Sequence, residues 1–276
     1  NGTVYQWAGA THTDTAQGVG PDVFSSATRV NVDAPVHGFG PFTMTTPGGT
    51  SAPLALNQLN VGELLRDLAY DPTTGRLWIA TNDNPAQIHR LNPATGVSEF
   101  SFTLTAGGFG TTNFFGGLQI VPSGGIANLG GTLNVPAGSL LVINGQANPD
   151  RIIAVDPLTG AVIASLTLNG VGQNYDATAG LYDPTSGHLF LASFNRNPDQ
   201  IFEIDPATGA QIGSAVNTPF DINHGGMALD PVSNNLWIGS SLTNTIAEIT
   251  RTGAVVRQVD LSVQGVNGGE ISGLSF

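Results

Sequence analysis

The chain contains no cysteine and no lysine, and these two absences exclude several kinds of chemistry. Without cysteine there is no disulfide, no thiol nucleophile and no thiolate ligand for a metal. Without lysine, mechanisms that use an amine as a base or to form a Schiff base are excluded as well. The formal net charge of −12 opposes contact with a phosphate backbone, so no nucleic-acid partner is expected.

Long hydrophobic stretches are also missing. The apolar runs end after about five to eight residues, too short for a membrane-spanning helix, so no membrane span is expected. The N-terminus lacks a charged and then apolar leader, and the chain starts at Asn1, so we expect an upstream signal or pro-segment to have been removed. Low charge density, no cysteine and abundant Asn, Thr and Gly together predict a bacterial protein that is secreted, extracellular or periplasmic.

What the chain has instead is a repeated turn sequence. "IFEIDPATGA" at 201–210 returns as "IHRLNPATGV" from Ile88, "IIAVDPLTGA" from Ile152 and "IAEITRTGAV" from Ile246. Proline presets the negative φ of a turn, the Asp or Asn before it bonds the backbone ahead, and glycine accepts the positive φ that closes it. Each copy therefore reads as two short β-strands joined by a tight turn.

Two further turn sequences recur in the same order along the chain. Asp-Pro follows an apolar run at 71–72, 183–184 and 230–231, with Val121-Pro122 as a variant. Asn-Pro precedes an Ile-containing strand at 84–85, 148–149 and 197–198, with Asn244-Thr245 in the fourth copy. The later copies follow one another at intervals of about 48 residues, and no segment has a helical period. Four strands in each repeat of this length are typical of a propeller blade.

We therefore predict an all-β fold, a β-propeller of four-stranded blades, with full blades at about 66–104, 116–168, 178–216 and 224–261. The C-terminal residues 270–276 match the inner strand of the other blades, and their partners are predicted at about 28–59, so that both ends of the chain close the ring. Residues 1–276 then form a single domain of five blades, or six if residues 1–27 contribute another. An insertion at about 123–138, between the first and second strands of its blade, is predicted to be a separate contact surface.

The Asp-Pro-x-Thr-Gly hairpins, and strand-turn sequences such as Gly180-Leu181-Tyr182-Asp183-Pro184, resemble the NHL and YVTN type of β-propeller. That broad group also includes the streptogramin lyase and gluconolactonase families. The resemblance covers about 66–276 and implies the fold; it implies no one activity, because enzymes, binders and scaffolds share these turns. Gluconolactonase-like propellers, which have six blades, use Glu, Asn and Asp around one metal to polarise a lactone or ester carbonyl.

The candidate site is the face shared by the loops that precede each inner strand and the loops between second and third strands. Each approach to an inner strand supplies an oxygen ligand, as Ca²⁺ or another hard cation requires. The predicted metal ligands are Glu63, Asn113, Asn174, Asp176, Asp221 and Glu270. In a metal-dependent lactonase-like or esterase-like hydrolase, or a lyase, His224 would be the general base. The alternative is that these Asn and Asp side chains only satisfy turns and solvate the face.

Aromatic residues fall in the same loops. The predicted ligand-binding or partner-binding residues are Phe114, Phe115, Tyr175, Phe220 and Asn223, which would stack on a sugar ring or anchor a partner, or else plug the channel. No nucleophile elbow, paired-histidine metal motif or phosphate loop occurs in the sequence. The sequence thus predicts a secreted, non-catalytic binding or structural propeller that recognises a protein or glycan by its loop face, stabilised by Ca²⁺. The alternatives are the hydrolase or lyase and a segment of a larger cell-surface adhesive or matrix protein.

Overall fold

The computed structural model describes residues 65–81, 85–104, 116–131, 133–145, 147, 149–168, 175–261 and 271–276, together with the backbones of four short N-terminal strands. Of these four, β1 (Gly2–Gln6) pairs with β4 (Thr28–Val32), and β2 (Thr11–His12) pairs with β3 (Asp22–Val23). Nowhere in these ranges is there a helix with the length and apolar character that crossing a bilayer requires.

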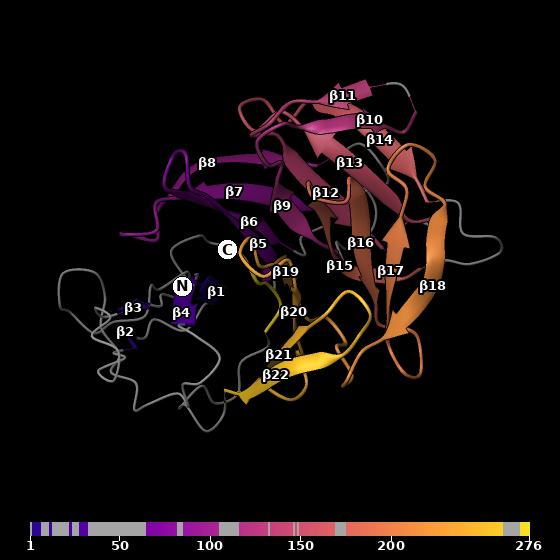
Figure 1. The fold of residues 1–276 in the computed structure, drawn as a ribbon. Coiled ribbons are helices and arrows are strands. Elements are labelled where there is room, and N and C mark those ends of the chain that lie inside the picture. Colours follow the sequence, from indigo (N-terminus) through magenta and orange to yellow (C-terminus); the bar gives the residue numbers. More distant parts are fainter. Residues whose placement is uncertain are drawn as a thin grey trace.

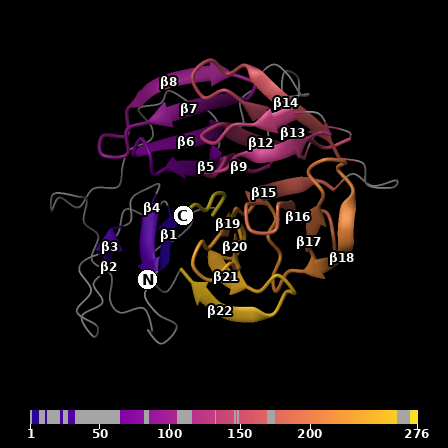
Figure 2. The ribbon, with the colours of Figure 1, turned by 45° about the horizontal axis from the view of Figure 1, so that its top comes forward.

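Four antiparallel sheets of four strands each surround a common axis (Figures 1 and 2). The first holds β5 (Leu65–Asp71), β6 (Arg76–Thr81), β7 (Gln87–Leu91) and β8 (Ser98–Thr103); the second holds β9 (Leu118–Ile120), β12 (Leu140–Asn144), β13 (Arg151–Val155) and β14 (Val162–Thr167). The third holds β15 (Ala177–Asp183), β16 (His188–Ser193), β17 (Gln200–Ile204) and β18 (Gln211–Asn217); the fourth holds β19 (Met227–Leu229), β20 (Leu236–Gly239), β21 (Thr245–Ile249) and β22 (Val255–Asp260). Within each sheet the strands follow one another from the axis outward, which confirms the predicted propeller of four-stranded blades.

The C-terminal residues occupy a fifth inner position, between β19 and β5. The Gly226 N–H donates to the carbonyl oxygen of Ile271 at 3.3 Å, and the Tyr70 N–H donates to Ser275 Oγ at 3.1 Å. Figure 2 shows this end of the chain near the axis, beside β19. The described residues thus contain four complete blades and one further inner segment. Apart from β4, which pairs with β1, the predicted partners of that segment at 28–59 lie outside the described residues.

Large apolar side chains fill the spaces between the blades. Trp78, Phe190 and Trp237 hold equivalent places in the second strands and are all buried. Trp78 packs in a cluster with Leu118 and other residues of the second blade, and Trp237 packs with Leu274 and other residues of the C-terminal segment. The outermost strands β8 and β18 have only half-buried and exposed positions, so the core lies between adjacent sheets and toward the axis.

The Asp-Pro turns are held by their aspartates. Asp71, Asp183 and Asp230 each accept a hydrogen bond from the backbone N–H two residues ahead, at 2.9, 2.9 and 2.8 Å. Each also accepts one from the Thr or Ser hydroxyl three residues ahead, at 2.6, 2.6 and 2.7 Å. The sequence Asp-Pro-x-(Thr or Ser) is therefore a complete turn, in which the carboxylate replaces solvent for the turn's own donors.

The insertion in the second blade is a hairpin formed by β10 (Ile126–Leu129) and β11 (Leu133–Val135). Ile126, Leu129 and Val135 are buried in a cluster shared by the second and third blades. The Gly130 N–H donates to the carbonyl oxygen of Pro206 in the third blade at 2.9 Å. The hairpin therefore fastens two blades together; its use as a surface for a partner stays a prediction.

Candidate functional site

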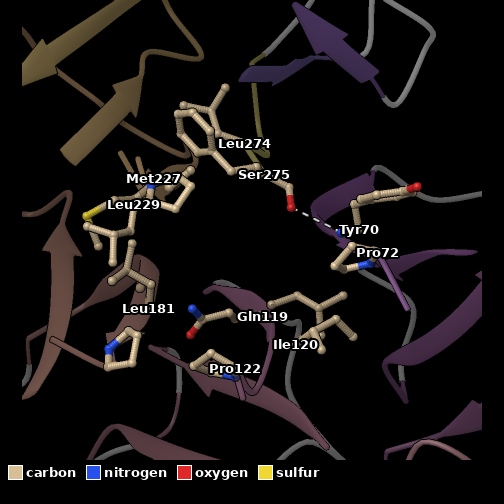
Figure 3. Close-up of a pocket in the computed structure, with 16 residues that line it drawn as sticks. Tyr70, Pro72, Gln119, Ile120, Pro122, Leu181, Met227, Leu229, Leu274 and Ser275 are labelled. Carbon is tan, nitrogen blue, oxygen red and sulfur yellow. Dashed lines mark hydrogen bonds between the residues drawn. The ribbon is translucent and has the colours of Figure 1, made fainter. Parts of the chain in front are cut away.

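A pocket of about 430 Å³ lies on the propeller axis, at the end where the inner strands run into the Asp-Pro turns. Figure 3 shows its side chains around a central space, with Leu274 and Ser275 facing Gln119 and Ile120 across it. The predicted mouth lies at the residues that precede the inner strands, which is the opposite end of the same strands. The pocket therefore lies at an end of the axis for which the sequence predicted no site.

Four prolines from equivalent turns line this pocket: Pro72, Pro122, Pro184 and Pro231. Three of them directly follow the aspartates that hold the turns, and those carboxylates are directed into the turn by the hydrogen bonds described above. The hydrogen bonds within each turn therefore hold the carboxylate away from the pocket, and the proline ring lines the pocket in its place. The tight turns of the blades and the apolar lining have the same cause.

The other walls are aliphatic or aromatic. They come from every inner segment, and the residues concerned are Tyr70, Leu118, Ile120, Gly180, Leu181, Met227, Ala228, Leu229, Leu274 and Phe276. Of the sixteen described residues that line the pocket, none has a charged side chain, and the polar side-chain groups are the Tyr70 phenol, the Gln119 amide and the Ser275 hydroxyl. The pocket is suited to an apolar ligand.

Just below the pocket the inner strands come into backbone contact. A Cβ added at Gly226 would lie 2.6 Å from the Cα of Gly273, and one added at Gly273 would lie 2.6 Å from Asp67 Oδ1. No side chain fits at such distances, so glycine is required at both positions. The residues that follow, Met227 and Leu274, line the pocket directly above this narrow level.

Asp67 fixes part of this arrangement. Its buried carboxyl accepts the N–H of Leu68 at Oδ1 and that of Leu118 at Oδ2, both at 2.7 Å, and so joins β5 to β9. Burial raises the pKa of Asp67 well above its ordinary value, although both backbone hydrogen bonds act to lower it. Because Leu118 lines the pocket, Asp67 positions a wall residue without itself lining the pocket.

The Gln119 amide and the Ser275 hydroxyl differ in what they can offer a ligand. Gln119 Oε1 accepts the Tyr182 N–H at 2.6 Å, and Gln119 Nε2 donates to the Tyr182 carbonyl oxygen at 3.0 Å, so this amide serves the backbone of the third blade. Ser275 Oγ accepts the Tyr70 N–H at 3.1 Å, and its own hydroxyl proton can be donated elsewhere. Figure 3 shows the Tyr70 hydroxyl directed away from the central space and the Ser275 hydroxyl at its edge, so Ser275 is the hydroxyl donor that the pocket can direct at a ligand.

Most residues of the predicted mouth lie outside the described part of the chain. Glu63, Asn113, Asn174, Glu270, Phe114 and Phe115 lie outside the described residues. Within the described ranges, no three or more His, Asp or Glu side chains are grouped so that they could hold a metal ion. Asp176 and Asp221 are described, and a Ca²⁺ site completed by the other ligands stays a prediction.

Asp176 and Asp221 lie instead beside two buried aspartates that join neighbouring blades. Asp150 Oδ2 accepts the Ala177 N–H at 3.2 Å, and Asp199 Oδ2 accepts the Ile222 N–H at 2.8 Å. Burial raises the pKa of Asp150 to about 7 and that of Asp199 to about 6, and the neighbouring carboxylates, Asp176 and Asp221 respectively, add to the rise. Neither acid is among the predicted site residues, although each directly follows an Asn-Pro turn in the repeat.

The remaining predicted site residues belong to the core or to a turn. Tyr175, predicted to meet a ligand or partner, is only 2% exposed and packs edge-on against Phe202 with ring centroids 4.9 Å apart. It therefore has almost no surface to offer a partner. Phe220 is half-buried and packs against the core cluster between the third and fourth blades.

Residues 221–224 form a turn held to the fourth blade. Asp221 Oδ1 accepts the Asn223 N–H at 2.9 Å, while Asn223 Nδ2 and the His224 N–H donate to Ser241 Oγ at 3.0 and 3.1 Å. The His224 ring lies 5.0 Å from the ring of Phe194. These contacts favour the turn-forming alternative for Asp221 and Asn223, and a catalytic role for His224 stays a prediction.

Comparisons with known proteins find similarity of fold. The chain is similar to a glutaminyl cyclase from Myxococcus xanthus, with a TM-score of 0.50 and 13% identity over 73% of this chain and 72% of that one. It is also similar to a protein of unknown function from Bacteroides caccae (TM-score 0.48, 12% identity, 95% of this chain and 74% of that one). A further similar structure is a catalytically inactive virginiamycin B lyase from Staphylococcus aureus with quinupristin (TM-score 0.41, 16% identity, 71% and 55%).

No protein-family model matches the chain, and no curated protein matches it either. At these identities the likeness extends to the fold and no further. The β-propeller fold that the resemblance implied is confirmed by the four-stranded blades and by the likeness to the glutaminyl cyclase.

Proposed function

We propose that this protein is a non-catalytic binding propeller that holds an apolar ligand group in the pocket on its axis. The observation that carries the proposal is the pocket lining, in which none of the sixteen residues has a charged side chain and four are equivalent prolines. A volume of about 430 Å³ suits a small molecule or an apolar group displayed by a partner protein. A glycan is less well suited, because its hydroxyls need many hydrogen-bond partners and this lining is poor in polar groups.

The same lining argues against catalysis in this pocket. Acid–base catalysis needs a group that titrates near the working pH within hydrogen-bond reach of the substrate, and nucleophilic catalysis needs a base beside the nucleophile. The lining supplies the Ser275 hydroxyl and the Tyr70 phenol, with no carboxylate or imidazole among the side chains of the sixteen residues. The hydrolase or lyase alternative depends on the opposite end of the axis and on a metal there.

A blocking variant with a matched control tests the proposal. Ile120 is half-buried in the pocket wall, so Ile120→Trp should fill the space, whereas Val256→Trp places the same side chain on the outer strand β22, where Val256 is 48% exposed. The wild type and these two variants are screened by thermal shift against small apolar compounds, sugars and peptides. At about 100 times Kd a ligand adds roughly 2.7 kcal/mol to stability, which is readily detected.

We expect the stabilising compounds to be apolar and to act on the wild type and Val256→Trp but not on Ile120→Trp. If every stabilising compound acts equally on all three proteins, ligands bind elsewhere and the proposal is wrong. We also propose a secreted or periplasmic location, which the low charge density and the abundance of Asn, Thr and Gly support. Fractionation of cells that produce the protein tests that location.

A further inference from the structure

Given the pocket as the binding site, which rests on the function proposed above, we infer the class of its ligand. We propose that the pocket takes a compact, uncharged ring system carrying one hydrogen-bond acceptor, and that the Ser275 hydroxyl donates to this acceptor. Three features of the pocket carry the inference: the shape of its walls, the absence of charged side chains from them, and the different hydrogen bonds that Gln119 and Ser275 already make.

The walls favour a ligand with flat apolar faces. Four proline rings, with Tyr70 and Phe276, supply rigid surfaces that come from different blades and enclose one space. Such rings lose little conformational freedom on binding, and they pack well against the face of another ring. Met227 adds a flexible thioether that can adjust to the outline of the ligand.

The electrostatics favour a neutral ligand. An ionised group that entered this lining would lose hydration and meet no side chain of opposite charge there. The nearby aspartates of the turns are occupied, since Asp71, Asp183 and Asp230 all accept hydrogen bonds from their own turns. Asp183 also forms an ion pair with Arg251 Nη2 at 2.9 Å. The net charge of −12 further disfavours an anion.

The hydrogen bonds favour one acceptor on the ligand. Both ends of the Gln119 amide are bound to the Tyr182 backbone, so a ligand that used this side chain would have to share it. Ser275 Oγ is already an acceptor for the Tyr70 N–H, which leaves its hydroxyl proton as the part that a ligand can use. Figure 3 shows this hydroxyl at the edge of the central space. A ligand rich in donors would find few acceptors to replace water.

Three probes with the same naphthalene ring separate these features: 2-acetylnaphthalene, which has a carbonyl acceptor; 2-ethylnaphthalene, which has none; and 2-naphthoate, which is charged. Their affinities are measured by displacement of the uncharged fluorophore N-phenyl-1-naphthylamine at pH 7.5. We expect the acetyl compound to bind about 3- to 10-fold more tightly than the ethyl compound. We expect the naphthoate to bind at least about 10-fold more weakly than either.

The variants Ser275→Ala and Ser275→Thr assign the effect to the hydroxyl. Ser275→Ala should reduce the acetyl-to-ethyl affinity ratio to about one, while Ser275→Thr should preserve the wild-type ratio. The ratio is the readout, because Ser275→Ala also removes the acceptor of the Tyr70 N–H and could loosen the pocket for both probes alike. Equal binding of the two probes by the wild type, or a preference that survives Ser275→Ala, overturns the inferred acceptor.

The outcomes distinguish the ligand class from the proposed function. Tightest binding of the naphthoate overturns the inference of a neutral ligand but leaves the pocket as the binding site, provided that Ile120→Trp abolishes the binding. If no naphthalene probe binds while other compounds lose binding in Ile120→Trp, the inferred ligand class is wrong and the proposed function stands. If no compound that binds is affected by Ile120→Trp, the proposed function is itself wrong.

Discussion

The carboxylate of Asp199 accepts a hydrogen bond from the backbone N–H of Ile222, 2.8 Å away, and so ties the third blade to the first residues of the fourth. The same arrangement joins Asp150 to Ala177 one blade earlier. Both acids are buried, so the contacts that join the blades depend on groups whose ionisation is costly.

This burial predicts how stability changes with pH. The pKa values of Asp150 and Asp199, about 7 and about 6, lie above the ordinary value of 3.8, so the folded protein binds more protons than the unfolded chain between these limits. The stability that these groups contribute is fully present below about pH 4 and is lost as the pH rises through 6 and 7. We expect the melting temperature to fall between pH 5 and pH 8.

The variant Asp199→Asn isolates this effect from general charge repulsion, because the amide oxygen can still accept the Ile222 N–H but does not titrate. Its melting temperature should change less between pH 5 and pH 7 than that of the wild type. Identical pH profiles for the two proteins would show that Asp199 does not titrate in this range.

Two leucines of one hairpin test how the insertion acts. Leu129 is 1% exposed in the cluster between the second and third blades, whereas Leu133, four residues later, is 47% exposed. Leu129→Ala should lower the free energy of unfolding by about 2 to 4 kcal/mol, and Leu133→Ala by no more than about 0.5 kcal/mol. Urea denaturation measures both; a similar small loss in each would mean that the hairpin does not contribute to the core.

Glycine is required where the inner strands touch. Gly226→Ala would place a methyl group 2.6 Å from the Cα of Gly273, against backbone that cannot rotate away. We expect a loss of about 1 to 3 kcal/mol or more, together with weaker binding in the pocket, because Met227 and Leu274 would be displaced. Gly75→Ala is the comparison, since its Cβ meets nothing within 4 Å and its cost comes only from a φ of +66°. Unchanged melting and binding in Gly226→Ala would contradict the tight contact.

The predicted cation site is tested by titrating chelator-treated protein with Ca²⁺ in a calorimeter and by melting it with and without the ion. We expect binding heat and a higher melting temperature, both lost when Asp221→Ala is combined with Glu270→Ala. Asp156→Ala, in the turn after β13 at the other end of the blade, is the control and should bind the ion as the wild type does. If wild-type protein gives no heat and no shift, the metal prediction is wrong, and the hydrolase alternative loses its support.

The fold could be predicted because its strongest signals are local. An aspartate that binds the N–H two residues ahead and the hydroxyl three residues ahead specifies its own turn, and Asp183 with Ser186 shows that both contacts are made. Repetition of such turns then specifies the blades. The place of residues 271–276 also followed from the sequence, because Gly273 and Leu274 match an inner strand.

The pocket could not be predicted in the same way, because its shape depends on contacts between distant segments. The sequence interpretation followed the loops rich in Asn and Asp, which several turns explain equally well. The pocket exists because the inner strands touch at Gly226 and Gly273, while the prolines of separate turns lie apart at the next level along the axis. Asp150 and Asp199 did leave a signal, the sequence Asn-Pro-Asp, which occurs twice at the same place in the repeat.

The seam between the second and third blades has three separate fastenings: Gln119 binds the backbone of Tyr182, Asp150 binds that of Ala177, and the hairpin reaches across at Gly130. A ring under thermal fluctuation opens first where the fewest such links must break together. Three side-chain links also join the third blade to the fourth: Asp199 to Ile222, Asp183 to Arg251 and Thr185 to Asn234. Backbone amides along both seams should therefore be among the last to exchange their hydrogens with solvent, and the second, third and fourth blades should behave as one cooperative unit.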